Sequence, residues 1–186
     1  MQTKSDTFGK FCEFKALVDV ESGKKMKALR SDNGGEFILA EFKDFCSAEG
    51  IRRELIAPHN PQQNGVVERK NRTIVGAARA MLHDKGLPLH FWAEACNATV
   101  YVQNRCPHKI LGMSTPEEAY SGKSPDIFHL RIFGSPVYMH VTKDARKKLD
   151  PIAEVGIFVG YTDTPHKYRV YVSDSRNIVV RQDIKF

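Results

Sequence analysis

Residues 29–37 read LRSDNGGEF, and residues 61–73 read PQQNGVVERKNRT. The first stretch places Asp32 directly after a short strand expected over residues 26–31 and before a turn-forming Asn-Gly-Gly. The second places Glu68 in the first turn of a long helix expected over residues 66–85. Ligands of open α/β sheets bind at the carboxyl ends of the strands, so these acids point to both the fold and the site.

The chain around Asp32 has the order of a β-α-β unit. Apolar residues at near-helical spacing predict a helix over residues 5–20, before the strand at 26–31. A second amphipathic helix, ending at Gly50, leads to a strand at 51–56. Its buried face is expected to carry Leu39, Phe42, Phe45 and Cys46. This order favours a parallel pair of strands with a helix packed across it.

Residues 57–65 contain two prolines and end at Gly65, which predicts a loop with a glycine hinge. Beyond the long helix, Pro88 is expected to open another helix. Its buried face should carry Phe91, Trp92, Ala95, Thr99 and Val102, with Trp92 in the core. Thr115 begins a capping box with proline at the first helical position.

After about Leu130 the pattern changes to short segments rich in β-branched and aromatic residues. These segments are expected to be strands over residues 132–141, 155–161, 168–172 and 178–186. They predict a small antiparallel barrel or meander. The chain is therefore divided into residues 1–120, a linker at 121–130 and a β domain at 131–186.

The composition sets only broad limits. The 186 residues carry 41% hydrophobic and 27% charged residues, a formal net charge of +6 and a pI of about 9.1. That balance is typical of a globular protein and permits a polyanionic partner. No stretch predicts a membrane span. The four cysteines form no Cys-x-x-Cys pair, so we expect reduced, mostly buried thiols and no zinc ribbon.

Two parallel strands would bring Asp32 and Glu68 to the same sheet edge, although thirty-five residues (33–67) separate them. Mg²⁺ prefers oxygen ligands, so both acids are candidate catalytic residues and metal ligands. The candidate DNA contacts are Gln62, Gln63, Asn64, Arg69, Lys70, Asn71 and Arg72. Simpler interpretations remain open: Asp32 as a turn former, Glu68 as a surface acid paired with Arg72 at i+4, and Arg69 and Lys70 as a solvated face of the helix.

The two quoted stretches resemble the integrase of Ty1/copia-type retrotransposons. Further matches occur at FWAEA (91–95), NR (104–105), TPEE (115–118), HLRIFG (129–134) and FVGY (158–161). The resemblance covers nearly the whole chain. It implies an α/β fold, a ribonuclease-H-like integrase core lacking its first strands, followed by a small SH3-like β barrel.

The resemblance also implies an Asp, Asp, Glu triad, with Asp32 and Glu68 in the second and third positions. Such enzymes use Mg²⁺ or Mn²⁺ to trim the element's DNA ends and join them to target DNA. Their partners are therefore DNA and other integrase-like chains in an oligomer, with no membrane. The place of action implied is intracellular, in the nucleus or in a cytoplasmic virus-like particle.

The sequence departs from the family pattern at the first acid, which in the family lies upstream of the opening helix. Neither Asp6 nor Asp19 replaces it by position. The family's amino-terminal zinc-binding segment is also missing. We therefore expect a fragment with an exposed strand edge at residues 26–31, weak Mg²⁺ binding and no integrase activity alone.

Two other functions stay open. The chain could be a non-catalytic nucleic-acid-binding or interaction module that uses Arg69, Lys70, Arg72, Arg79 and the basic residues 146–148. It could also be a functionless relic of the element. Salt-sensitive DNA binding that needs no metal favours the module.

Overall fold

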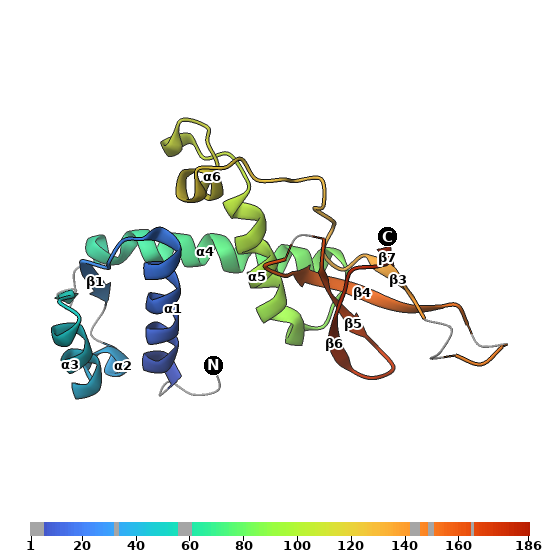
Figure 1. Ribbon diagram of the computed structural model, residues 1–186, viewed down its shortest axis with the longest axis horizontal. Helices are drawn as coiled ribbons and strands as arrows, with labels where there is room; N and C mark the ends of the chain where they lie inside the picture. The colour runs from blue at the N-terminus through green and yellow to red at the C-terminus, as the bar shows by residue number, and fades with distance from the viewer. Residues whose placement is uncertain (1–5, 32–33, 56–60, 142–145, 149–150, 165) are drawn as a thin grey trace. The chain divides into compact units, whose positions relative to one another are not determined.

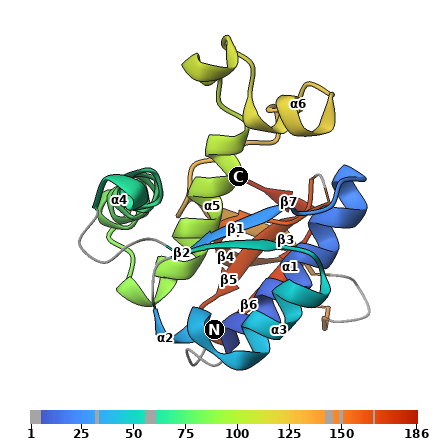
Figure 2. The same ribbon diagram turned by 90° about the vertical axis from the view of Figure 1, so that its left-hand side faces the viewer.

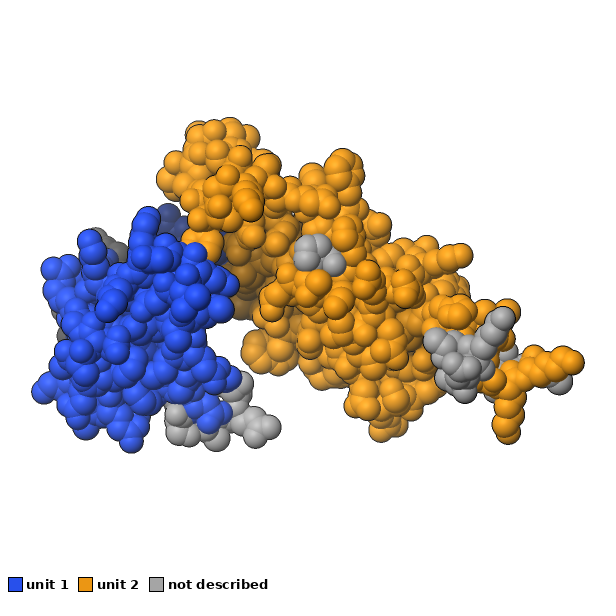
Figure 3. Space-filling view, in the orientation of Figure 1, with its two compact units in different colours: residues 1–70 blue, residues 71–186 orange. Residues whose placement is uncertain are grey.

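The computed structural model describes residues 6–31, 34–55, 61–141, 146–148, 151–164 and 166–186. The side chains of residue 36 and of residues 61–64 are outside this description. The chain divides into two compact units, residues 1–70 (unit 1) and residues 71–186 (unit 2), coloured separately in Figure 3. Each unit has its own hydrophobic core, and each contains both helices and strands.

Unit 1 contains the predicted β-α-β arrangement. Helix α1 (Asp6–Ser22) leads to strand β1 (Ala28–Ser31), followed by α2 (Gly35–Ile38), α3 (Ala40–Ala48) and β2 (Arg52–Leu55). Strands β1 and β2 pair in parallel, with Leu29 opposite Arg53, which confirms the predicted parallel pair. Helices α1 and α3 lie together on one side of this pair (Figure 2).

The core of unit 1 lies between α1, α3 and the strands. Phe42, Cys46 and Ile51 are buried, and the Phe11 ring stacks on Phe42 with centroids 4.9 Å apart. The single helix predicted after the turn is wrong, because Leu39 has an extended backbone (φ −55°, ψ 143°) that separates α2 from α3. Leu39 is exposed, in contrast to the predicted buried face.

A buried lysine ties α1 to the end of α3. The Nζ atom of Lys15 lies 2.7 Å from the Asp19 carboxylate and 2.8 Å from that of Glu49. The hydrogen bonds to Asp19 and then Glu49 raise the pKa of Lys15, and the same bond from Lys15 lowers the pKa of Asp19. Asp19 also accepts a hydrogen bond from the Met26 amide at 3.3 Å. Asp19 is thus a structural residue in the approach to β1.

Helix α4 (Pro61–Asp84) begins earlier than the sequence indicated. Its first five residues fall in the segment predicted as a loop, and Gly65 lies inside a helix, so the predicted hinge is wrong. Proline suits the first helical position because its missing N–H has no partner there in any case. Residues 57–60, the rest of the predicted loop, lie outside the described part, as does residue 56 at the end of the predicted strand.

In unit 2, the end of α4 is followed by the short helix η1 (Leu89–Phe91) and by α5 (Trp92–Asn104). Phe91, Ala95 and Thr99 face the core as predicted, but Trp92 is 63% exposed, so its predicted core position is wrong. The short helix η2 (Lys109–Leu111) precedes α6 (Pro116–Ser121). The Thr115 hydroxyl accepts a hydrogen bond from the Glu118 amide at 3.1 Å, as the capping box predicted.

The last third of the chain forms one antiparallel sheet with strand order β6-β5-β4-β3-β7. Its strands are β3 (Pro136–His140), β4 (Ala153–Tyr161), β5 (Tyr168–Val172), β6 (Asn177–Arg181) and β7 (Ile184–Lys185). Phe158 is completely buried, and its ring meets those of Tyr161, Tyr168 and Phe186. The small all-β segment predicted after Leu130 is confirmed.

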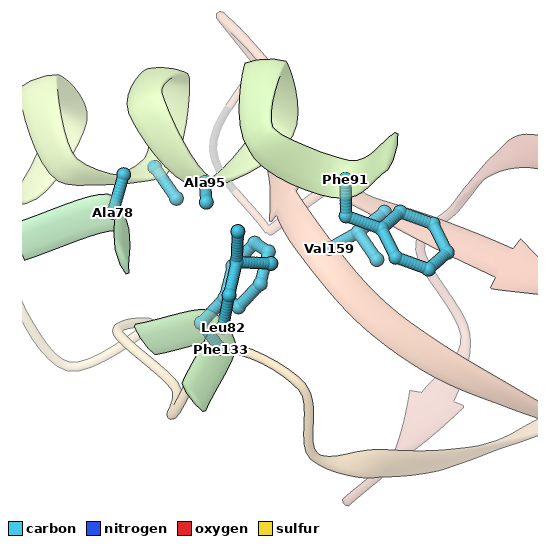
Figure 4. Packing of buried hydrophobic residues seen from close by; sticks show 7 residues of the cluster. Ala78, Leu82, Phe91, Ala95, Phe133 and Val159 are labelled. Carbon is cyan, nitrogen blue, oxygen red and sulfur yellow. The ribbon is translucent and has the colours of Figure 1, made fainter. Parts of the chain in front are cut away.

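The sheet packs on the helices of unit 2 through a shared core. Figure 4 shows Ala78 and Leu82 of α4, Phe91 and Ala95, Phe133, and Val159 of β4 meeting there. A bidentate ion pair also joins α5 to the sheet: Arg169 of β5 donates to both carboxylate oxygens of Glu94, at 2.8 and 2.6 Å. The linker expected at 121–130 stays a prediction. The two compact units of the structure meet at a different place in the sequence, after residue 70.

Gly134 marks the close approach of this sheet to the end of α4. Its φ is +81°, and an added Cβ would lie 2.7 Å from Cγ of Lys85. Both the backbone and the space therefore require glycine at this position.

The sequence also makes predictions about the four cysteines and about membrane-spanning segments. Of the four free cysteines, Cys46 is buried, Cys12 and Cys96 are half-buried and Cys106 is exposed, so the expectation of mostly buried thiols is wrong. Among the helices in the described ranges, none has the length and apolar character needed to cross a bilayer.

The sheet core depends on Phe158. We expect Phe158→Ala to lower the free energy of unfolding by about 3–5 kcal/mol, because it leaves a cavity among three aromatic rings. The matched control Phe128→Ala, at a ring that is 88% exposed, should change it by less than about 0.5 kcal/mol. Urea unfolding followed by circular dichroism measures both, and equal losses would contradict the assignment.

The Glu94–Arg169 pair should contribute to docking of the sheet on α5. A double-mutant cycle with Glu94→Gln and Arg169→Met is expected to give a coupling energy of about 1 kcal/mol, reduced because the Arg169 side chain is 36% exposed. The exposed pair Lys10–Glu13 is the control, with coupling indistinguishable from zero. A Glu94–Arg169 coupling no larger than the control's would show that the pair is incidental.

Candidate metal and nucleic-acid site

The two strands of unit 1 end together, as the sequence predicted. Ser31, the last residue of β1, is 8% exposed and lies opposite Leu55, the last residue of β2. Asp32 follows Ser31 but lies outside the described residues, so its approach to Glu68 stays a prediction. The described part shows that the segment before Asp32 and the segment leading to α4 leave the sheet at the same edge.

An ionic cluster fixes the register of this parallel pair. Arg30 donates from Nε and one terminal nitrogen to a Glu54 oxygen, at 3.1 and 2.8 Å, and Arg52 reaches the other oxygen at 2.7 Å. The hydrogen bond from Arg30 and then that from Arg52 lower the pKa of Glu54. Arg30 and Glu54 are register partners, so this cluster opposes a slip of the strands.

On the opposite face of the sheet, Arg53 holds helix α2, the first helix that follows Asp32 in sequence. Its guanidinium donates to the Phe37 carbonyl of α2 and lies over the Phe42 ring, 5.7 Å from its centroid. Strand β2 is thereby bound to the first helix after the turn. The described residues on either side of residues 32–33, Ser31 and the segment that begins at Gly34, are therefore anchored to this pair of strands.

Glu68 lies on α4 with its side chain exposed. Glu68 and Arg72 form no ion pair within the described residues, so the interpretation of Glu68 as a surface acid paired at i+4 is not supported. Asn71 and Arg72, at i+3 and i+4, lie on the same side of the helix. Arg69, Lys70, Asn71 and Arg72 are all exposed.

The other candidate contacts, Gln62, Gln63 and Asn64, belong to the first turns of α4 and not to a loop. Their side chains are outside the description, so their proposed contacts stay predictions. The carboxylate oxygen of Glu68 suits a hard cation such as Mg²⁺. Across the described ranges, no group of three His, Cys, Asp or Glu side chains could hold a metal ion. The residues therefore fit Mg²⁺ by donor type, with Glu68 as the one predicted ligand that is described.

Sequence reasoning did not find a buried polar cluster in unit 2. His129 is 5% exposed, and its Nε2 lies 2.7 Å from the Tyr101 hydroxyl. Nδ1 of His129 is buried and has no hydrogen-bond partner among the described atoms. The Tyr101 ring stacks on Tyr161 at 4.3 Å, and the Arg105 guanidinium lies over its other face at 3.5 Å. The sequence carries no signal for this cluster, because its members at positions 101, 105, 129 and 161 share no motif or spacing.

The cluster borders a cavity of about 560 Å³ between α5 and β4, lined by Glu94, Tyr101, Arg105 and Tyr161 among others. Its strongest polar groups are already paired: Glu94 with Arg169, and the Tyr161 hydroxyl with the carbonyl of Arg131 at 2.9 Å. This cavity is therefore part of the packing of unit 2 and offers no chemistry of its own.

Comparison with known proteins agrees with this architecture. Residues 135–186 match the family described as the retroviral polymerase SH3-like domain. The chain is 42% identical over its whole length to the retrovirus-related Pol polyprotein from transposon TNT 1-94 of Nicotiana tabacum, of which it covers 14%. It is 33% identical over 90% of its length to that from transposon RE2 of Arabidopsis thaliana, of which it covers 11%. The chain thus spans about one seventh or less of these relatives.

Among solved structures, a chain of the simian T-cell lymphotropic virus intasome in complex with PP2A regulatory subunit B56 gamma matches 97% of this chain and 62% of its own length. The TM-score is 0.53 and the identity 18%, so this likeness concerns the fold alone. The magnesium complex of the HTLV-2 integrase catalytic core domain, in its trimeric form, matches 64% of this chain and 71% of that one, with 24% identity and a TM-score of 0.48.

The buried histidine should make the stability of unit 2 depend on pH. Burial, the largest cause, lowers the pKa of His129 below its ordinary 6.5. As the pH falls below about 6.5, His129 binds a proton in the unfolded chain but stays neutral in the folded chain. The free energy of unfolding therefore decreases. Above that pH both states are neutral and the effect vanishes.

Urea unfolding between about pH 5 and 7.5 measures this dependence, since it spans the ordinary histidine range. The slope should flatten in His129→Gln and persist in the control His83→Gln, which changes an exposed residue of α4. An unchanged slope in His129→Gln would assign the dependence to other groups.

Proposed function

The chain is homologous to the retrovirus-related Pol polyproteins of plant transposons, and from this premise we propose that it is the part of an integrase that supplies two carboxylates, Asp32 and Glu68, to metal-dependent polynucleotidyl transfer on DNA. The observation that carries the proposal is the common edge at which β1 and β2 end. Asp32 follows one of these strands in sequence, and the other leads toward α4, which presents Glu68 to solvent.

In this proposal Asp32 and Glu68 hold Mg²⁺ or Mn²⁺ through their carboxylate oxygens. The bound ion would polarise the phosphodiester and activate the attacking water or hydroxyl. The chain's own contribution is to fix the two acids. The Arg30–Glu54–Arg52 cluster and Arg53 anchor the described segments on either side of Asp32, and the regular geometry of α4 orients Glu68.

The exposed side of α4 supplies the proposed DNA contacts. Arg72 lies one helical turn beyond Glu68, where its guanidinium could hold a phosphate near the ion. Asn71, Arg69 and Lys70 are exposed on the same helix, and Gln62, Gln63 and Asn64 occupy its first turns. The proposed partners are DNA and further integrase-like chains in an oligomer.

Two carboxylates hold a hard cation weakly, because Mg²⁺ gives up its water reluctantly. We expect Mn²⁺ to bind this chain with a dissociation constant on the order of 1 mM, and to give no strand transfer on an oligonucleotide substrate. Paramagnetic broadening in NMR spectra during a Mn²⁺ titration measures the site directly. The broadening should centre on the amides around Asp32 and Glu68.

Both Asp32→Asn and Glu68→Gln should remove this broadening. The matched control is Asp84→Asn, which removes an exposed acid at the other end of α4 and should leave the broadening unchanged. Broadening that survives both site variants would refute the proposed site. Robust strand transfer by the chain alone, abolished by Asp32→Asn, would refute the expectation of inactivity.

A non-catalytic nucleic-acid-binding module is the second candidate. One observation favours it: α4 exposes Arg69, Lys70, Arg72 and Arg79 along its length, and side chains of this kind neutralise phosphates without a metal. DNA binding that is unchanged by EDTA and by both acid variants, together with no localised Mn²⁺ broadening, selects the module.

A further inference from the structure

The face of the β1–β2 pair that points away from the core of unit 1 is charged. Leu29 and Arg53 face the core, so the alternation along each strand turns Arg30, Arg52 and Glu54 to the opposite face. The side chains of Arg30 and Arg52 are 62% and 76% exposed. Parallel strands are usually covered on both faces, which makes an exposed and charged face on this pair unusual.

Three lysines extend this positive region at the start of β1. Lys24, Lys25 and Lys27 are exposed and lie between α1 and β1. The carbonyl of Lys27 accepts a hydrogen bond from the Arg52 amide at 3.0 Å, which places the run beside the start of β2. We call Lys24, Lys25, Lys27, Arg30 and Arg52 the basic face.

The acids around the basic face are already engaged. Glu54 binds both arginines, while Asp19 and Glu49 bind Lys15. In the part of the chain that the structure describes, none of the three lysines of the basic face forms an ion pair. Three carboxylates lie near these five cations: Glu54, which both arginines share, Asp19, whose pKa Lys25 helps to lower, and Glu21 in the last turn of α1. The basic face therefore keeps a local positive surplus.

We propose that the basic face binds the phosphodiester backbone of a nucleic acid, at a surface separate from the edge that carries the carboxylates. The three lysines precede β1, and a strand advances roughly 3.3 Å per residue, so Lys27 lies about 13 Å from Ser31 at the other end of the strand, after which Asp32 follows in sequence. The inference rests on the proposed function in one respect, that the partner is a nucleic acid.

The chemistry of the basic face suits a repeating phosphate chain. Lysine ammonium groups are point charges on flexible stems, and contacts of this kind bind phosphates without reading base sequence. The arginines are held in place by Glu54, so they add fixed charges beside the mobile ones. The basic face therefore retains DNA near the chain irrespective of sequence, and it needs no metal.

The test measures binding of the full chain to a labelled duplex of ~20 base pairs, by fluorescence anisotropy in EDTA, from about 50 to 200 mM salt. The variant is Lys24→Gln/Lys25→Gln/Lys27→Gln. The control is Lys109→Gln/Lys123→Gln/Lys185→Gln, at three exposed lysines of unit 2. Each triple variant removes three charges from the formal +6, leaving +3, so the two share one net charge.

In the basic-face variant, we expect affinity at about 100 mM salt to fall tenfold or more and the slope of log K against log salt to become shallower by about 2 to 3. The control should lose less than about twofold. A single-stranded oligonucleotide of the same length should follow the same order with a smaller slope, since its backbone condenses fewer counterions.

Several outcomes would overturn the proposal. The first is that the unchanged chain does not bind the duplex in EDTA, and the second is that the two triple variants weaken binding equally. The third is that the basic-face variant loses binding to phosphatidylserine vesicles while its duplex binding is unaffected. Circular dichroism checks folding, and Lys25→Gln alone, which should reduce the slope by about 1, serves if the triple variant misfolds. Because the assay excludes metal, Asp32→Asn/Glu68→Gln should bind as the unchanged chain does, which separates this proposal from the proposed function.

Discussion

The packing of α5 against β4 is the contact on which unit 2 depends. Phe91 and Ala95 of the helical segment and Val159 of the sheet are all nearly or completely buried in one core. Burying a large apolar side chain stabilises a fold by about 1.5–3 kcal/mol, which exceeds what a half-exposed ion pair such as Glu94–Arg169 contributes. Figure 1 shows helix α5 beside strand β4. The SH3-like segment is therefore held mainly by apolar contact with the preceding helices, and the ion pair adds a smaller contribution.

Helix α4 connects this core with the candidate site. Its last turns place Ala78 and Leu82 in the core of unit 2, while Glu68 lies ten residues before Ala78 on the same helix. Packing far from the carboxylate thus stabilises the helix that presents it, and propensity alone need not sustain a helix with an internal glycine.

Local patterns predicted the elements better than they predicted burial. The strand at 168–172, the parallel pair and the Thr115 cap follow from alternation, from β-α-β order and from capping chemistry, all of which act over a few residues. Leu39 and Trp92 were placed in cores because they are apolar, yet both are exposed. Burial depends on what approaches a residue in space, and one sequence does not carry that information for a residue at a helix boundary.

The charged residues of unit 1 show the same contrast between local patterns, which the sequence reveals, and contacts between distant segments, which it does not. The motif identified Asp32 and Glu68 by spacing, whereas Lys15 and the Glu54 cluster were invisible, because their partners come from distant segments. These clusters have a joint effect on unit 1. They pair Asp19 and Glu49 with Lys15, and Glu54 with Arg30 and Arg52, while the carboxylate motif follows the other end of β1 in sequence. One pair of strands therefore separates a surface suited to holding a polyanion from the edge proposed to hold a metal.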